Sequence, residues 1–341
     1  MPEHFIAFWN VENLFGPEDH PHREERIASR IRSDLVGWDR AMYDRKCAQL
    51  SDIIAGMDTG SGPDILGVCE VEDAHVLGDL VAALEARLPD RSYGIVHAQN
   101  DADWRGIDTA FIYDRDRYSV DPDLVFNHFV VRRTGTRDIL QATFRTMAGN
   151  DLVLLCNHWP ARKGNPEGSA GFRATAGETL AYWHDRIREE TGTRTPILAM
   201  GDFNDDPWDA SVMVNANAKR ERGDVERSNS AMFYNFAWEY MQVTAISASG
   251  RTRRLAGTLY YDNDGCLYDQ MLANRALLDS KAASFKVVDG SARMETPQAM
   301  VDNSVSRGPR RFGLPKGKAS KVDLDGYSDH FPVSIRLIET E

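Results

Sequence analysis

The sequence contains no apolar run of about eighteen residues, and this absence excludes a transmembrane helix. Cysteine is scarce as well. The four cysteines, Cys47, Cys69, Cys156 and Cys266, are widely separated and form no CxxC pair, which argues against a structural zinc site and a disulfide framework. The N-terminal stretch MPEHFIAFWNVENLF lacks the basic region and long apolar segment of a secretory signal. We therefore expect reduced cysteines and a cytoplasmic location.

Two common catalytic motifs are also missing. No glycine-rich phosphate loop ending in Lys-Ser/Thr is present, so we do not expect a nucleotide-driven motor. No GxSxG elbow for acyl transfer is present either. Positive charge is in short supply, since 40 Lys and Arg residues face 52 Asp and Glu residues and the net charge is −12. This balance argues against a protein that coats nucleic acid by bulk electrostatics and leaves room only for local basic patches.

Short apolar runs and longer helical patterns follow one another along the chain. The runs typical of buried strands are Phe5–Trp9, Ile65–Cys69, Ala110–Tyr113, Leu152–Cys156, Ile197–Met200 and Phe331–Leu337. Apolar residues recur at helical spacing in three stripes, which begin at Tyr43, Val76 and Phe172 and end at Met57, Leu88 and Ile187. We interpret each stripe as a helix face that packs on a core.

Polar side chains stand where several of the predicted strands end. Asn10 follows the first strand, Glu70 the second and His158 the fourth, while Asp202 and Asn204 follow the fifth. A strand buried on both faces can present polar groups only at its ends. We therefore predict that these side chains share one rim of the fold.

The last strand has its polar pair, Asp329 and His330, before the apolar run instead of after it. If this strand runs antiparallel to its neighbours, its start lies at the same rim. Glu70 and Asp329 would then supply hard oxygen ligands for Mg²⁺ or Mn²⁺, and Asn10 would add a neutral oxygen or orient Glu70.

The remaining rim residues fit hydrolytic chemistry. Asp202 and Asn204 lie two apart on a turn and can both point at one attacking water, whereas His158 and His330 can move a proton or stabilise phosphoryl charge. Each residue alone has a structural explanation, such as capping for Asn10. The whole set nevertheless indicates metal-assisted hydrolysis of a phosphate ester.

Two polar stretches are typical of surface insertions. Ala210–Arg227 is charge-rich and predicts a surface helix or loop. Asn303–Lys321 has six basic residues and no acidic one, and it is either a solvated loop or a mobile basic arm that holds a phosphate-bearing substrate. The candidates for substrate contact are Arg310 and Arg311 in this stretch, together with Arg162, Lys163 and Arg173. The last three follow His158 and either contact a second phosphate or a polynucleotide backbone, or form a solvated loop.

Seven motifs occur in a fixed order from Phe8 to Val333, namely FWNVENLF, LGVCEVED, RGIDTAFIYD, NHWPAR, GDFNDDP, LYDQML and YSDHFPV. Together they resemble the motif set of the endonuclease/exonuclease/phosphatase superfamily, which has a deoxyribonuclease-I-like fold. The resemblance covers nearly the whole chain. It implies one catalytic domain over residues 1–341, with an α/β fold in the form of a four-layer α-β-β-α sandwich of two mixed β-sheets.

The resemblance also implies a role for each rim residue. Asn10 and Glu70 match the metal-site pair, with Mg²⁺ or Mn²⁺ as the cofactor, and Asp329 matches the acidic residue beside the metal. His158 matches the histidine that steadies the phosphoryl oxygens, and Asp202 and Asn204 match the pair that positions the attacking water.

Two further carboxylates take their expected roles from the same resemblance. Asp269, in LYDQML, matches the residue that orients the catalytic His330, and Asp108 is expected to do the same for His158.

The resulting hypothesis is a divalent-metal-dependent phosphodiester hydrolase, with nucleic acid favoured as its substrate. The alternative is a phosphodiesterase or phosphatase for a small or lipid-linked phosphoester. Trp104, Trp159 and Trp208 could stack on bases or grip a headgroup, or could simply pack in the core. A non-catalytic binding module is a third hypothesis. The presence of the complete motif set argues against it.

Overall fold

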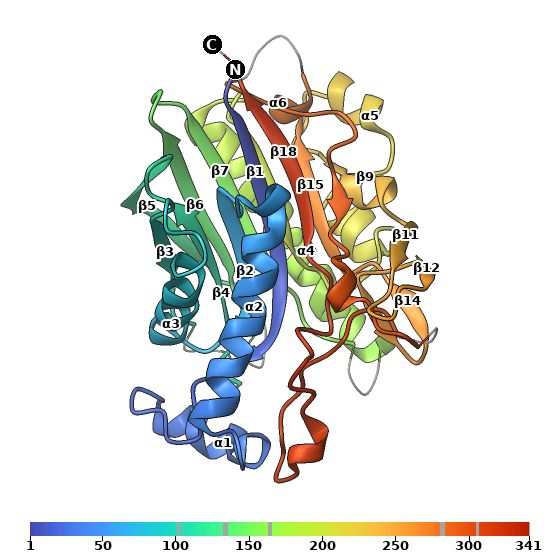
Figure 1. The fold of residues 1–341 in the computed structure, drawn as a ribbon. Coiled ribbons are helices and arrows are strands. Elements are labelled where there is room, and N and C mark those ends of the chain that lie inside the picture. Colours follow the sequence, from blue (N-terminus) through green and yellow to red (C-terminus); the bar gives the residue numbers. More distant parts are fainter. Residues whose placement is uncertain are drawn as a thin grey trace.

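Two seven-stranded mixed sheets lie face to face at the centre of the computed structural model (Figure 1). The structure describes residues 1–100, 103, 105–131, 136–162, 166–279, 284–304 and 307–340. The first sheet has the order β16 (Phe285–Val287), β18 (Val333–Glu339), β1 (Glu3–Leu14), β2 (Ile65–Val71), β4 (Asp108–Asp114) and β3 (Tyr93–His97), and β17 (Arg293–Met294) also pairs with β18. The second has the order β5 (Tyr118–His128), β6 (Ile139–Thr146), β7 (Asp151–His158), β8 (Ile197–Asp202), β15 (Asp269–Asn274), β10 (Phe233–Asn235) and β9 (Ala218–Lys219).

Helices cover the outer faces of both sheets (Figure 1). The helices are α1 (Glu25–Leu35), α2 (Arg40–Gly60), α3 (Ala74–Glu85), α4 (Pro166–Thr191), α5 (Arg222–Arg227) and α6 (Arg275–Leu278). The apolar faces of α1, α2 and α3 belong to the same core as the first sheet, whereas α4 packs in a second core on the outer face of the second sheet. The predicted four-layer α-β-β-α sandwich is therefore confirmed. Two small hairpins, β11 (Val243–Ile246) with β12 (Thr252–Leu255) and β13 (Leu259–Tyr261) with β14 (Asp264–Cys266), complete the strands.

Gly67 on β2 shows how closely the two sheets approach. A Cβ atom at this position would lie only 2.8 Å from the Sδ atom of Met200 on β8. Protein interiors pack as densely as organic crystals, so the second sheet leaves no space for even one extra methyl group here. The two sheets therefore pack closely at this point, where β2 faces β8.

The strand directions bring the predicted rim together. β1 runs parallel to β2, and β7 runs parallel to β8, so the carboxyl ends of each pair lie at one edge. β18 runs antiparallel to β1 and β15 runs antiparallel to β8, so these strands begin where the others end. The condition placed on the last strand is thus met, and His330 lies just before β18 at the shared edge.

Residues 210–227 are more integrated than a surface insertion. They form a π-helical turn at Ser211–Asn215, strand β9 and helix α5. Val212, Ala216 and Ala218 are buried in the second core. The segment therefore closes the edge of the second sheet, because its few apolar residues are spaced to meet α4 and β10. Among the described residues, none of the helices has the length and apolarity that a membrane crossing requires.

His184 on α4 gives the fold a testable pH dependence. Its side chain is buried and stacks on Phe233 at 4.0 Å, and burial, helped by Arg188, lowers its pKa to about 3. The unfolded state, with a pKa of about 6.5, binds the extra proton first, so this contribution is complete above that pH and is lost as pH falls toward 3. We expect about 2 kcal/mol of stability to be lost between about pH 6.5 and 5 through this residue alone. Urea denaturation of wild type and His184→Leu should show a shallower pH slope in the variant, and equal slopes would contradict the assignment.

Candidate active site

The backbone at the rim departs from regular strand geometry at several polar residues. Glu12, Asn13, Glu70 and Asn204 have positive φ angles of 54°, 49°, 64° and 50°, although none is glycine. The β1–β2 register shifts between Asn10 and Leu14, and the β2–β4 register shifts on either side of Glu70. This conformation is common for Asn but costs on the order of 1–3 kcal/mol in a residue such as Glu, so Glu12 and Glu70 are the clearest departures.

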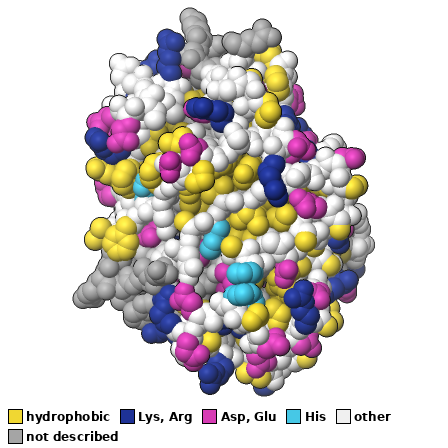
Figure 2. Space-filling view, turned by 90° about the vertical axis from the view of Figure 1, so that its left-hand side faces the viewer, with side chains coloured by type: hydrophobic (Ala, Val, Ile, Leu, Met, Phe, Trp, Pro, Cys, Tyr) yellow, Lys and Arg dark blue, Asp and Glu magenta, His cyan; other side chains and the backbone are white. Residues whose placement is uncertain are grey.

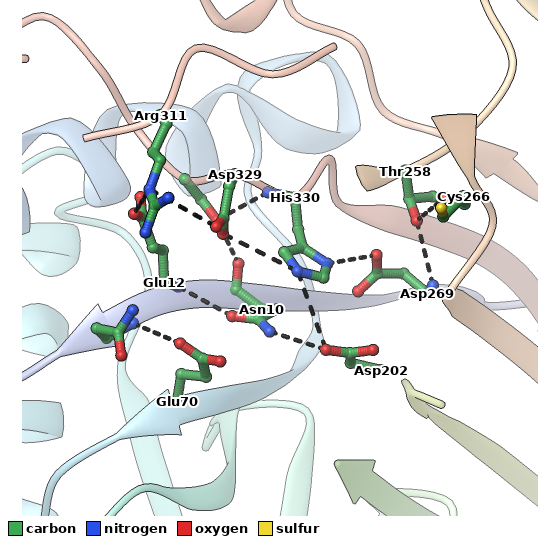
Figure 3. Close-up of polar contacts among 12 residues, drawn as sticks. Asn10, Glu12, Glu70, Asp202, Thr258, Cys266, Asp269, Arg311, Asp329 and His330 are labelled. Atoms are coloured by element: carbon green, nitrogen blue, oxygen red, sulfur yellow. Dashed lines mark hydrogen bonds and ion pairs between the residues drawn. The ribbon is translucent and has the colours of Figure 1, made fainter. Parts of the chain in front are cut away.

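Asp202, at the end of β8, contacts several of the other rim residues (Figure 3). Its Oδ2 accepts a hydrogen bond from Asn10 Nδ2 at 3.0 Å, and its Oδ1 accepts one from the Asn204 backbone N–H at 2.9 Å. His330 Nε2 lies 3.9 Å from Asp202 Oδ2. Burial raises the pKa of Asp202 to about 7; His330 opposes this rise and Asp269 adds to it. The carboxyl group is therefore poised to exchange a proton near neutral pH.

His330 is held by the first residue of β15. Its Nδ1 lies 2.7 Å from Oδ2 of Asp269, whose side chain is completely buried. Its backbone carbonyl accepts a hydrogen bond from Trp9 Nε1 at 2.7 Å, which fixes the chain on the other side of the ring. Burial by itself would lower the pKa of His330, but the carboxylates of Asp269 and Asp202 outweigh it and hold this pKa well above its usual value. Imidazolium is thus the form that this pocket favours.

His158, at the end of β7, lies between carboxylates and a cation. Its Nε2 is 3.8 Å from Glu70 Oε1 and 3.7 Å from Asp202 Oδ2. The guanidinium of Arg137 lies 2.9 Å from Nε2 and 3.2 Å from Nδ1. Burial, followed by the charge of Arg137, lowers the pKa of His158 well below its ordinary value, so the ring is neutral. No sequence motif marks Arg137, because its contact joins the segment before β6 to the end of β7.

Asp108 does not orient His158 as the sequence analysis expected. Its Oδ2 lies 2.9 Å from Nε2 of His97, and its Oδ1 accepts a hydrogen bond from the Asn100 backbone N–H at 3.3 Å. Both oxygens are occupied by neighbours on β3 and the loop after it, because β4 pairs directly with β3. Among the described contacts, the side chain of His158 is held by Arg137 instead.

The donor set at the rim fits a hard divalent cation. Glu70 Oε2 accepts the Asn13 backbone N–H at 2.9 Å, which leaves Oε1 facing the rim. Asn10 and Asp329 bring further oxygen atoms from β1 and from the residues before β18, the two strands next in line to β2. Carboxylate and amide oxygens are the ligands that Mg²⁺ and Mn²⁺ prefer. These residues therefore suit the cofactor that the sequence indicated.

A second group of ligand atoms lies deeper. Atoms of Cys69, His158 and Asp202 fall within 4.8 Å of one another, and all three residues are buried. Burial raises the pKa of Cys69 well above its ordinary value, so the thiol stays protonated. A neutral thiol is a poor ligand for a hard cation, and the oxygen set is the better candidate for magnesium.

A cleft of about 1140 Å³ opens beside His330 and Asn204. Its walls come from the β13–β14 hairpin and from the segment before β18, and they include Tyr260, Tyr261 and Arg311. Tyr261 is 67% exposed at the tip of the hairpin. The cleft therefore offers an aromatic surface and a cation within one substrate-sized space next to the rim.

The five residues expected to contact substrate are placed differently from one another. Arg311 and Arg162 both line the cleft, but Arg162 is bound to carboxylates, with its Nη2 2.7 Å from Asp205 Oδ1. Arg310 is paired with Asp323 at 2.7 Å. Arg173 is buried, and its Nε lies 2.7 Å from Asp205 Oδ1, so the expected direct contact with substrate is wrong for this residue. Lys163 lies outside the described residues.

The three tryptophans also differ. Trp208 is 48% exposed and remains a candidate for stacking. Trp159 is buried in the second core, and its Nε1 donates a hydrogen bond to Asn157 Oδ1 at 3.1 Å, so it packs instead of binding. Trp104 lies outside the described residues.

The sandwich and its rim of carboxylate, amide and imidazole groups define a hydrolase that acts on phosphate esters. The chain belongs to the endonuclease/exonuclease/phosphatase family, whose sequence model matches residues 5–339. No curated protein sequence matches it. The resemblance that the seven motifs indicated is thereby confirmed.

Three solved structures have a similar fold over almost the whole chain. A mannosyl-6-phosphatase of Bacteroides thetaiotaomicron is 15% identical with a TM-score of 0.55, and the match covers 98% of this chain and 99% of that one. The human nocturnin catalytic domain with bound sulfate is 16% identical with a TM-score of 0.51, over 99% and 95% of the two chains. A humanized D. rerio TDP2 is 14% identical with a TM-score of 0.54, over 98% and 99%. At these identities the likeness shows the shared fold.

Proposed function

We propose that the protein is a divalent-metal-dependent phosphodiester hydrolase and that nucleic acid is its substrate. One observation carries the proposal: Asp202 is joined to Asn10 by a hydrogen bond and lies beside His330, whose other ring nitrogen is bound to Asp269. This is the linked set of base, acid and orienting carboxylate that hydrolysis of a phosphate ester requires.

The chain's own side chains divide the chemistry among them. Asp202 accepts the proton of the attacking water, because its pKa lies near neutrality, and Asn204 on the following turn helps to orient that water. His330, as an imidazolium held by Asp269, donates to a phosphoryl oxygen, and neutral His158 donates a second hydrogen bond. Glu70, Asn10 and Asp329 would hold Mg²⁺ or Mn²⁺, which supplies charge neutralisation at the phosphoryl oxygens.

The cleft supports nucleic acid as the substrate class. Tyr261 presents an exposed ring, and base stacking on such rings contributes about 1–3 kcal/mol per base. Arg311, in the segment before β18, supplies a cation for a backbone phosphate in the same cleft. A platform for a base and a cation for a phosphate are the two elements that a nucleotide unit needs.

A small phosphoester is the second candidate, and one observation favours it. Besides the proposed metal ligand Asp329, four carboxylates line the same cleft, namely Asp262, Asp264, Asp302 and Asp323. They would repel a long polyanion more than a compact substrate, in line with the net charge of −12.

Nicking of supercoiled plasmid at low salt with Mn²⁺ tests the proposal. We expect wild type to nick the plasmid, and EDTA, Glu70→Gln and His330→Ala each to abolish the reaction. Glu70→Gln should also weaken Mn²⁺ binding, measured by calorimetry, whereas His330→Ala should bind Mn²⁺ normally. If the plasmid stays intact while a simple aryl phosphodiester is hydrolysed, the chemistry stands and the substrate is a small phosphoester. If neither is cleaved, the proposed function is wrong.

A further inference from the structure

We propose that Glu12 is a positioning residue that holds the guanidinium of Arg311 at the cleft, so that the free edge of Arg311 binds phosphate oxygens of the substrate. The inference rests on the proposed function for its substrate class. It adds a residue that the motif roles leave unassigned, although Glu12 lies only two positions after Asn10.

Glu12 is buried at the distorted end of β1, and three of its side-chain contacts are with the segment before β18. Its Oε1 accepts a hydrogen bond from Arg311 Nε (Figure 3). Its Oε2 accepts the backbone N–H groups of Phe312 at 3.1 Å and Gly313 at 3.3 Å. The positive φ of 54° at Glu12 is the conformation that turns the chain at this point. One carboxylate thus binds both the side chain of Arg311 and the backbone that follows it.

Lys46 on α2 forms an ion pair with Glu12. Its Nζ lies 3.7 Å from Glu12 Oε2 and donates a hydrogen bond to the carbonyl of Tyr327. Both Lys46 and Glu12 have side chains that are only 1% exposed. A buried ion pair of this kind fixes geometry more than it stabilises the fold, since the cost of desolvation cancels much of the attraction. The ion pair with Lys46 holds Glu12 in contact with Arg311, as a positioning role requires.

The edge of Arg311 that points away from Glu12 is free. Only its Nε has a partner among the described residues, on Glu12 and, at 3.7 Å, on Asp329. The side chain is 57% exposed and lines the cleft. The two terminal nitrogens therefore remain available as a planar fork, the geometry that binds phosphate oxygens in pairs.

Neighbouring arginines differ in this respect. Arg310 uses Nε and Nη2 on the two oxygens of Asp323, at 2.7 and 2.9 Å. Arg162 uses Nε on Asp205 at 2.9 Å and Nη2 on Asp209. Each of these side chains has a terminal nitrogen already bound to a carboxylate, whereas that of Arg311 does not. Arg311 is thus better prepared to receive an anion than Arg310 or Arg162.

The backbone around Arg311 is fixed as tightly as its side chain. Phe312 is 1% exposed and packs edge-on against Trp38 at 5.9 Å. A Cβ atom at Gly326 would lie 2.1 Å from the Arg311 carbonyl oxygen, so the two chain segments touch directly. The backbone at Arg311 and Phe312 is therefore anchored in the wall of the cleft.

A double-mutant cycle tests the proposal. Glu12→Gln, Arg311→Ala and the double variant are assayed for KM and kcat on an aryl phosphodiester and for the dissociation constant of inorganic phosphate by calorimetry. We expect each single variant to raise KM and the phosphate dissociation constant by about 10- to 100-fold, the range of a hydrogen bond to a charged group. The double variant should be no worse than Arg311→Ala alone. We expect kcat to change by less than about threefold throughout.

Arg45→Ala is the control, because it removes an arginine that already bonds Leu324 and Asp325 and lies outside the cleft lining, and it should leave KM unchanged. Additive effects of Glu12→Gln and Arg311→Ala would overturn the proposal, as would a Glu12→Gln effect confined to Mn²⁺ affinity. If Glu12→Gln leaves Lys46 unpaired and the protein unfolded, Glu12→Gln with Lys46→Met keeps the test intact. Phosphate binding needs no turnover, so failure of the proposed function and failure of this inference give different results.

Discussion

Replacing Asp202 with asparagine is expected to lower kcat by about 10²–10⁴-fold, the usual loss when a general acid–base group is removed. The substitution removes the group whose pKa of about 7 suits it to accept a proton. It also leaves a donor unmatched, because both oxygens of Asp202 accept hydrogen bonds, one from Asn10 and one from Asn204. The measurement is kcat on an aryl phosphodiester at saturating Mn²⁺.

Asp209 offers a control for this variant. It lies on the same loop seven residues later, and its Oδ2 accepts the backbone N–H of Asp206 at 2.7 Å and a hydrogen bond from Arg162. Asp209→Asn should therefore affect local stability more than turnover. An Asp202→Asn protein that is folded by circular dichroism and still turns over within about threefold of wild type would remove Asp202 from the mechanism.

The rim residues could be predicted because the evidence for each one lies in the adjacent sequence. Asn10, Glu70 and Asp202 each follow a continuous apolar run that predicts a buried strand. Parallel pairing of β1 with β2 and of β7 with β8 then brings the strand ends together. The predicted strands are short, continuous apolar runs. The missed ones have weaker patterns. β5 is largely exposed along one edge of its sheet, and β15 is a short buried strand whose sequence, DQMLAN, contains three polar residues.

The contacts that hold the rim were not predictable, because they join distant parts of the chain. Glu12 and Arg311 are 299 residues apart, and neither side chain reveals its partner in the sequence. For Arg173 the sequence predicted a contact with substrate that the structure does not support. Its position after a catalytic motif predicted a substrate contact, but burial against Asp205 uses its charge inside the fold. Sequence patterns placed the candidate site residues at strand ends but could not show which charges are already paired.

Asp269 provides the second large effect. Its Oδ2 lies 2.7 Å from His330 Nδ1, whereas its Oδ1 is buried with no hydrogen-bond partner among the described residues. A carboxylate here forces the Nδ1–H form of the ring and supports its positive charge, as the acid of a catalytic triad does. Asp269→Asn should lower kcat by about 10²–10⁴-fold, because the amide neither holds that tautomer nor supports the imidazolium.

The pairing also makes the effects of the two residues dependent on each other. His330→Ala should lose activity to a similar extent, and the double variant should be no slower than His330→Ala alone, because Asp269 acts only through the ring. The ¹⁵N resonances of His330 should shift from imidazolium toward the neutral ring in Asp269→Asn at pH 7. Effects that multiply in the double variant would show that Asp269 touches the reaction by another route. An unchanged histidine spectrum would show that Asp202 alone sustains the charge.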